Sequence, residues 1–330
     1  MPNKVSPELS IVVPVYNESK TNLDALLGRL QSVLEPLISY EIIFVDDGSL
    51  ESTASVLREL PRIHLNVRTV VLSRNFGEQA AICAGLKQAR GEVTVNMDSD
   101  LQDPPELVPT MLQHWRDGCD VVYTQQIDRS DSFLRLLSTN AYYWLLHKFS
   151  KVAISHSGEF RLLSRRAVDA LLAMPEKTVF LRYLVPFIGF KQVTIPFKRG
   201  QRTEGASSYS FIRLLRLGIS GLIAASSFPL LFIPTAGLLL AFVGGGAYFI
   251  AGQGQMNMLP LLVWLSFLIN MSSLVVIAIY ISATLSEVRA RPLYIVSEVI
   301  TNASSKIQKS LNDQTTTAFD ANRLDAAKIG

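Results

Sequence analysis

The chain has 330 residues, which exceeds the usual size of one domain, so we expect a soluble core with a second module. Its formal net charge is only +3, and no run of Lys and Arg interleaved with aromatic residues occurs, so we expect no nucleic-acid partner. Hydrophobic residues make up 48% of the chain and gather toward its C-terminus, which predicts membrane spans there.

The first 126 residues alternate short apolar, β-branched runs with stretches of helical spacing. Strands are expected at residues 9–15, 41–45, 67–72, 93–97 and 121–124. Helices are expected at residues 20–37, 79–90 and 106–116. This alternation predicts a mostly parallel α/β sheet that binds its ligands at the carboxyl ends of the strands.

The pattern becomes more helical after residue 126. Helices are expected at residues 133–149, 165–173 and 179–187, and a strand at 191–196. Residues 209–228 follow, where Arg213, Arg216 and Ser220 share one face of an otherwise apolar helix. This spacing favours an amphipathic helix in a membrane interface. A buried helix whose arginines reach the surface is the alternative.

Two apolar segments, residues 229–251 and 259–285, contain no Lys, Arg, Asp or Glu. Each is long enough to cross a hydrocarbon layer of ~30 Å. Arginines precede the first segment and follow the second, so the positive-inside rule places both outer ends in the cytoplasm. Small residues in the first segment, among them Gly237 and Gly246, favour close helix packing and a homo-oligomer.

These patterns predict a multi-pass membrane protein with four parts. Residues 1–208 form a cytoplasmic catalytic domain, 209–228 an interfacial helix, 229–285 a hairpin of two membrane helices, and 286–330 a cytoplasmic tail. The free cysteines fit a reducing compartment, because Cys83 and Cys119 lack the spacing of a metal site or a disulfide framework.

Acidic residues follow two of the expected strands. Asp46 and Asp47 precede Gly48 after the second strand, where a carboxylate can accept hydrogen bonds from a base or a ribose; a turn that caps the next helix is the alternative. Asp98 and Asp100 follow the fourth strand and point the same way if the segment is extended. Such a pair suits Mg²⁺ or Mn²⁺ bridging to a diphosphate. Neither a G-x-G-x-x-G nor a P-loop motif occurs.

Charged residues of both signs occur further along the chain. Glu159 and Arg161 lie beside an apolar run, where catalysis and a structural ion pair are equally reasonable interpretations. Lys198, Arg199 and Arg202 come shortly before the amphipathic segment. Cations at a membrane surface suit a lipid phosphate, and general attraction to anionic headgroups predicts the same residues.

Six motifs in order carry a family resemblance: VVPVYNE, DDGS, RNFGEQAA, MDSDLQDPPE, GEFRLLSRR and RTEGASSYS. Followed by two spans, they resemble the family 2 glycosyltransferases that act on polyprenyl phosphates, the group of dolichol-phosphate mannose synthases and bactoprenol glucosyltransferases. The resemblance implies a GT-A type, Rossmann-like nucleotide-sugar domain and inversion at the anomeric carbon. It implies a UDP- or GDP-sugar donor, with UDP-glucose the best match, and undecaprenyl phosphate as acceptor.

The resemblance also implies roles for individual residues. Nucleoside contacts are implied for Pro14, Tyr16, Glu18 and Asp46 or Asp47. Metal and diphosphate contacts are implied for Asp98, Asp100 and Gln102. Acceptor and catalytic roles are implied for Asp100, Glu159, Arg161, Lys198, Arg202 and Ser207. The chain departs from the family at Glu159, where Asp is usual, and at Ser208, where Lys is frequent.

Three other functions are alternatives to this one. A mannosyltransferase that uses GDP-mannose fits the same motifs. A processive polysaccharide synthase would need more spans and a Q-x-x-R-W motif, which the chain lacks. A membrane-tethered nucleotide-binding scaffold would have no need for Asp98, Asp100 and a cationic site beside the bilayer.

Overall fold

The computed structural model describes residues 6–126, 158–176, 180–197, 228–251 and 259–302. The expected helices at 133–149 and 209–228 lie outside these residues, apart from the last residue of the second. So do three candidate site residues, Lys198, Arg202 and Ser207.

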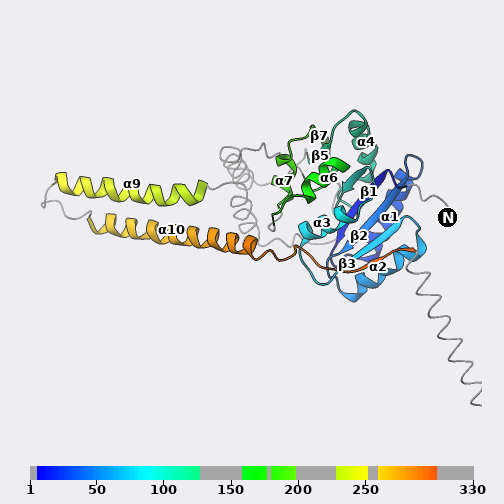
Figure 1. Cartoon of the computed structure of the whole chain (residues 1–330), viewed down its shortest axis with the longest axis horizontal. Coiled ribbons are helices and arrows are strands. Elements are labelled where there is room, and N and C mark those ends of the chain that lie inside the picture. The colour runs from blue at the N-terminus through cyan, green and yellow to red at the C-terminus, as the bar shows by residue number, and fades with distance from the viewer. Residues whose placement is uncertain (1–5, 127–157, 177–179, 198–227, 252–258, 303–330) are drawn as a thin grey trace, which may run out of the picture.

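An eight-stranded mixed sheet with the order β7-β5-β6-β4-β1-β2-β3-β8 organises the α/β part (Figure 1). The strands are β1 Leu9–Val15, β2 Tyr40–Asp46, β3 Val67–Leu72, β4 Val93–Asn96, β5 Val121–Gln126, β6 Arg161–Ser164, β7 Gln192–Phe197 and β8 Val296–Ile300. Neighbours pair in parallel from β4 through β1 and β2 to β3, and β5 pairs in parallel with β7. The remaining pairs, β4–β6, β5–β6 and β3–β8, are antiparallel.

Helices cover both faces of the sheet. They are α1 Lys20–Leu34, α2 Glu51–Ile63, α3 Glu78–Gln88, the 3₁₀ turn η1 Pro105–Leu107, α4 Val108–Arg116, α6 Arg165–Leu172 and α7 Leu181–Phe187. Strand β1 is buried along its whole length, because Ile11 and Val13 pack on one face with α1 and Val12 packs on the other with α3. A strand covered on both faces is a continuous apolar run, as its sequence shows.

The described elements match most of the predicted ones, with shifts at the ends. The first helix ends at Leu34, and the helix expected from residue 106 begins as the 3₁₀ turn η1, with Pro105 at its first position, where proline is tolerated. Helix α2 was not predicted. Strand β8 was not predicted either: it lies within the expected tail 286–330, pairs antiparallel with β3 and forms an edge of the sheet.

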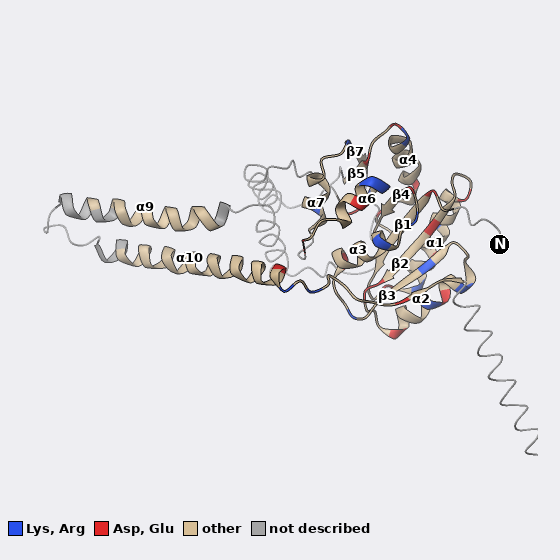
Figure 2. Ribbon diagram, viewed as in Figure 1, with Lys and Arg blue, Asp and Glu red and all other residues tan. Residues whose placement is uncertain are grey.

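Two long helices, α9 Phe228–Ala251 and α10 Leu259–Val288, lie side by side and extend away from the sheet (Figure 1). Charged residues belong almost entirely to the α/β part, and the pair is apolar (Figure 2). Within the described residues one stretch, Val263–Val288, is long and apolar enough to cross a membrane; Leu230–Val243 is a shorter apolar helix. The structure therefore supports one candidate span where two were expected.

Candidate active site

The carboxyl ends of β1, β2 and β4 meet at one edge of the sheet, because these neighbouring strands are parallel. Tyr16 follows β1 and is 55% exposed, whereas Pro14 is buried within the strand. Glu18 accepts hydrogen bonds from Asn22 Nδ2 at 2.8 Å and from the Ser19 N–H at 3.1 Å. Its carboxylate thus supports the first turn of α1, and a nucleoside contact at Glu18 stays a prediction.

The two aspartates after β2 have different partners. Asp46 Oδ1 accepts a hydrogen bond from the Ser49 N–H at 2.8 Å, which is the turn expected as the alternative for this motif. The Asp47 carboxylate accepts from the N–H groups of Phe76 (2.7 Å) and Gly77 (2.9 Å). Burial raises the pKa of Asp47, and these two backbone donors partly oppose the rise. Asp47 therefore anchors the loop between β3 and α3 to the end of β2.

Gly48 permits this anchoring. Its φ is +70°, and a Cβ at this position would lie 2.5 Å from Arg74 C and from Asn75 N. The loop after β3 consequently passes where only glycine leaves room.

The segment after β4 folds into a tight acidic turn. The Asp98 N–H donates to Asp103 Oδ2 at 3.1 Å, the Gln102 N–H donates to Asp100 Oδ1 at 3.1 Å, and Leu101 has a φ of +64°. Burial away from water raises the pKa of Asp98 well above its usual range. The negative charges of four nearby carboxylates raise it further: Asp103, Glu78, Asp100 and Glu159. Negative charge is therefore concentrated at this end of β4.

This acidic turn fits a divalent cation that is shared with a substrate. Within the described residues, no group of three His, Cys, Asp or Glu side chains forms a ready-made metal cage. Mg²⁺ is commonly held by one or two carboxylates together with substrate phosphates, and the excess negative charge around Asp98 is what such a cation would offset. Asp98 and Asp100 are the residues positioned to provide those carboxylates.

Glu159, Arg161 and Arg182 form an ion-paired cluster beside the acidic turn. Arg161 is 1% exposed and pairs with Glu159 Oε2, while Arg182 Nε donates to Glu159 Oε1 at 2.8 Å. Burial raises the pKa of Glu159, but the charges of Arg161 and Arg182 and hydrogen bonds from Arg182 and Gln79 outweigh it and hold the pKa below its usual value. Glu159 is thus an ionised partner of two arginines, so the structural ion pair is present.

Pairing of β4 with β6 brings this cluster to the acidic turn. Asn96 lies opposite Arg161 in the register, and its side chain donates a hydrogen bond to the Glu159 carbonyl. Residues distant in sequence, Asp98 and Glu159, therefore influence each other electrostatically.

Two site residues were missed by sequence reasoning. Burial raises the pKa of Glu78 to about 7, together with the negative charges of Glu159 and Asp100. The positive charges of Arg182 and Arg161 lower this pKa and only partly offset the rise. The position of Glu78 directly after Gly77, in the loop-to-helix segment that follows β3, was an available signal. Arg182 carried no local signal, because only the packing of α7 brings it to Glu159.

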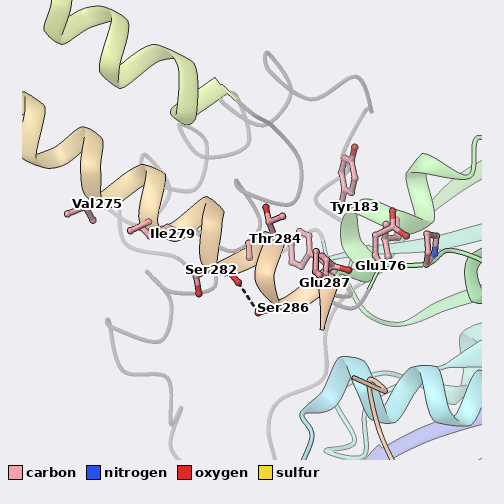
Figure 3. Close-up of a pocket in the computed structure, with 14 residues that line it drawn as sticks. Glu176, Tyr183, Val275, Ile279, Ser282, Thr284, Ser286 and Glu287 are labelled. Atoms are coloured by element: carbon pink, nitrogen blue, oxygen red, sulfur yellow. Dashed lines mark hydrogen bonds between the residues drawn. The ribbon is translucent and has the colours of Figure 1, made fainter. Parts of the chain in front are cut away.

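A cavity of about 1120 Å³ lies between α10 and the region of α7 (Figure 3). Apolar lining residues include Phe180, Tyr183, Val275 and Ile279, and the carboxylates Glu176 and Glu287 lie where α10 approaches the α/β part. The acidic turn and the Glu159 cluster do not line this cavity. It is therefore a second feature, located toward the candidate span.

The fold and the acidic edge define a GT-A type nucleotide-sugar domain. The chain belongs to glycosyltransferase family 2, whose sequence profile, described as glycosyl transferase family 2, matches residues 10–172.

Relatives match along most of the chain. An uncharacterised glycosyltransferase of Synechocystis is 34% identical over 304 residues, covering 88% of this chain and 95% of the relative. A prophage bactoprenol glucosyl transferase homologue of Escherichia coli is 33% identical over 305 residues, covering 88% and 99%. The structure of a mannosyltransferase from Pyrobaculum calidifontis with GDP-Man and Mn²⁺ is 18% identical, with a TM-score of 0.46 over 82% of this chain and 88% of that one.

Proposed function

We propose that this glycosyltransferase transfers glucose from UDP-glucose to undecaprenyl phosphate, with inversion, at the cytoplasmic face of the inner membrane. The observation that carries the proposal is the acidic turn of Asp98 and Asp100 beside the cluster of Glu159 with two arginines. A cation-binding edge and a cationic cluster suit a donor diphosphate and an acceptor phosphate respectively. The bactoprenol glucosyl transferases of Shigella phages, 30–31% identical, support this acceptor class.

In this proposal the donor lies at the carboxyl edge of the sheet. Tyr16 and Asp46 or Asp47 face the nucleoside, and Asp98, Asp100 and Gln102 would hold Mg²⁺ or Mn²⁺. When bound, that metal neutralises negative charge that develops on the nucleoside diphosphate leaving group.

The cluster of Glu159, Arg161 and Arg182 orients the acceptor. A phosphate monoester has a second pKa of about 6, so its attacking oxygen is already largely deprotonated at neutral pH. No strong general base is needed, and the ionised Glu159 serves to hold the arginines. Because Arg161 is 1% exposed, it acts through Glu159, and Arg182, whose side chain is 36% exposed, reaches toward the acceptor.

The membrane part completes the proposal. Both α9 and α10 cross the bilayer as a hairpin, and the apolar cavity between α7 and α10 receives the isoprenoid portion of the acceptor. We also propose a homo-oligomer; a monomer by light scattering in mild detergent would contradict it. Gly237 packs within the chain, because a Cβ there would lie 2.4 Å from Ile269 Cγ2, whereas Gly246 has open space around it.

Transfer of radiolabelled sugar from a panel of UDP- and GDP-sugars to undecaprenyl phosphate tests the function. The purified protein is assayed with and without Mg²⁺ or Mn²⁺. Metal-dependent labelled lipid from UDP-glucose supports the proposal, and labelled lipid from GDP-mannose alone would make the protein a mannosyltransferase. No lipid product from any donor, in folded protein that binds nucleotide, would favour the scaffold.

A further inference from the structure

Gln79, in the first turn of α3, bonds to two separate parts of the site. Its side-chain oxygen accepts a hydrogen bond from the Leu181 N–H at 3.1 Å, at the start of α7. Its side-chain amide also donates to the carboxylate of Glu159. One neutral side chain therefore links α3, α7 and the segment that precedes β6.

These bonds belong to a closed ring of hydrogen bonds among Gln79, Glu159, Arg161 and Leu181, called the circuit below. Arg161 donates to the Glu159 carboxylate and, through one guanidinium nitrogen, to the Leu181 carbonyl at 3.3 Å. Gln79 closes the circuit, since it contacts Glu159 on one side and Leu181 on the other. The next residue, Arg182, donates to the same carboxylate at 2.8 Å. The circuit thus fixes the acid and the backbone that carries Arg182.

Gln79 also connects the donor edge to the acceptor side. Two residues before it, the Gly77 N–H donates to Asp47 at 2.9 Å, which ties the start of α3 to the end of β2. On the other side, Phe180 and Tyr183 flank its partner Leu181 and line the cavity toward α10. Gln79 therefore lies between the loop that is anchored to the donor edge and the start of α7.

We propose that Gln79 is a positioning residue that sets Glu159 and Arg182 for the acceptor phosphate. The inference rests on the proposed function. A side chain at this position must donate a hydrogen bond to the Glu159 carboxylate and accept one from the Leu181 N–H. The glutamine amide has both the donor and the acceptor, on a side chain of the required length. Methionine offers neither, and glutamate offers only acceptors and places a second carboxylate beside Glu159.

The test measures KM separately for the lipid phosphate and for the donor sugar nucleotide. Gln79→Met is expected to raise the KM for undecaprenyl phosphate about tenfold, as loss of a hydrogen bond to a charged group would, and to leave the donor KM within about twofold. Gln113→Met is the matched control, because Gln113 lies exposed on α4, away from the site, and its side chain donates a hydrogen bond to Asp117 Oδ1 at 3.4 Å. Its two KM values should equal those of the wild type.

A second pair of variants separates positioning from folding. Gln79→Glu keeps the acceptor for Leu181 but should raise the acceptor KM at least as much as Gln79→Met. Adding Glu159→Gln reverses donor and acceptor across the same contact, so the acceptor KM should fall back toward that of Glu159→Gln alone. A merely structural role predicts no such recovery.

Unchanged acceptor KM in both Gln79 variants, or an equal rise in both KM values, would overturn the positioning role. If Gln79→Met fails to fold, the comparison of Gln79→Glu with the double variant decides. Absence of transfer by the wild type to any polyprenyl phosphate would instead overturn the proposed function.

Discussion

At the scale of single residues, the two acidic groups of the site are expected to differ in importance. Glu159 is ionised and paired with arginines, and a phosphate acceptor does not need it as a base. Glu159→Gln should therefore retain measurable turnover, about 10–100-fold below the wild type from misplacement. Asp100→Asn should lose nearly all activity, about 1000-fold or more, because charge on the leaving group is no longer offset. Initial rates of labelled-lipid formation by purified, folded variants check this, and equal losses would contradict it.

Gly48 offers a residue-scale test of the donor loop. Gly48→Ala places a Cβ 2.5 Å from the Arg74 and Asn75 backbone at a positive φ, so it should lower stability by about 2 kcal/mol or more and raise the donor KM. Gly28→Ala is the control, because Gly28 lies inside α1 with nothing within 4 Å of a new Cβ. Alanine should there be neutral or stabilising by up to about 1 kcal/mol. Thermal unfolding and nucleotide titration distinguish the two, and similar behaviour of both variants would contradict the close approach of the loop.

At the scale of elements, β8 ties the chain after α10 back to the sheet. Ile300 in β8 is 6% exposed and lies opposite Thr69 in β3, so Ile300→Ala should destabilise the protein by about 2–4 kcal/mol. Ile295, just before β8, is 52% exposed, and Ile295→Ala should change stability little. The thermal midpoints of the two variants in detergent give the comparison. An unchanged midpoint for Ile300→Ala would mean that β8 contributes no stability.

The strands differ in how well they can be predicted from their sequences. Strands β1 and β3 were predicted with their observed ends, because burial on both faces makes each a short run dominated by apolar and β-branched residues, although β3 includes Arg68. Strand β8 was not predicted, because its short sequence VSEVI includes two polar residues and gives only a weak hydrophobic pattern. Its partner β3 also lies far away in the sequence.

The residues of the candidate site also differ in how well they can be predicted from sequence. Asp98 and Asp100 follow a strand and so could be placed at the sheet edge from sequence alone. Their proximity to Glu159 depends on β4–β6 pairing, and Arg182 joins through the packing of α7. Local patterns do not encode these tertiary contacts.

At the scale of the whole molecule, α10 contains the candidate membrane span and leads directly toward the sheet. Its 30 residues extend about 45 Å at 1.5 Å per residue, longer than a hydrocarbon layer of ~30 Å. Exposed apolar side chains such as Trp264 and Phe267 follow most of its length, whereas β8 begins only a few residues after its end. The helix is therefore suited to be both a membrane anchor and a connection to the sheet.

A charge placed along α10 tests whether it spans. Leu274 lies near its middle and is 56% exposed, so Leu274→Arg should reduce stable insertion, because an arginine at a bilayer centre costs about 2.5–3.5 kcal/mol. Leu285 is 47% exposed and lies near the end, where an arginine can reach the headgroups, so Leu285→Arg should insert like the wild type. The measurement is the fraction retained in membranes after alkaline carbonate washing. Release of the wild type by salt alone would place α10 on the bilayer surface. Equal retention of both variants would do the same, because an arginine in the middle of a helix is more costly than one near its end only if the helix crosses the bilayer.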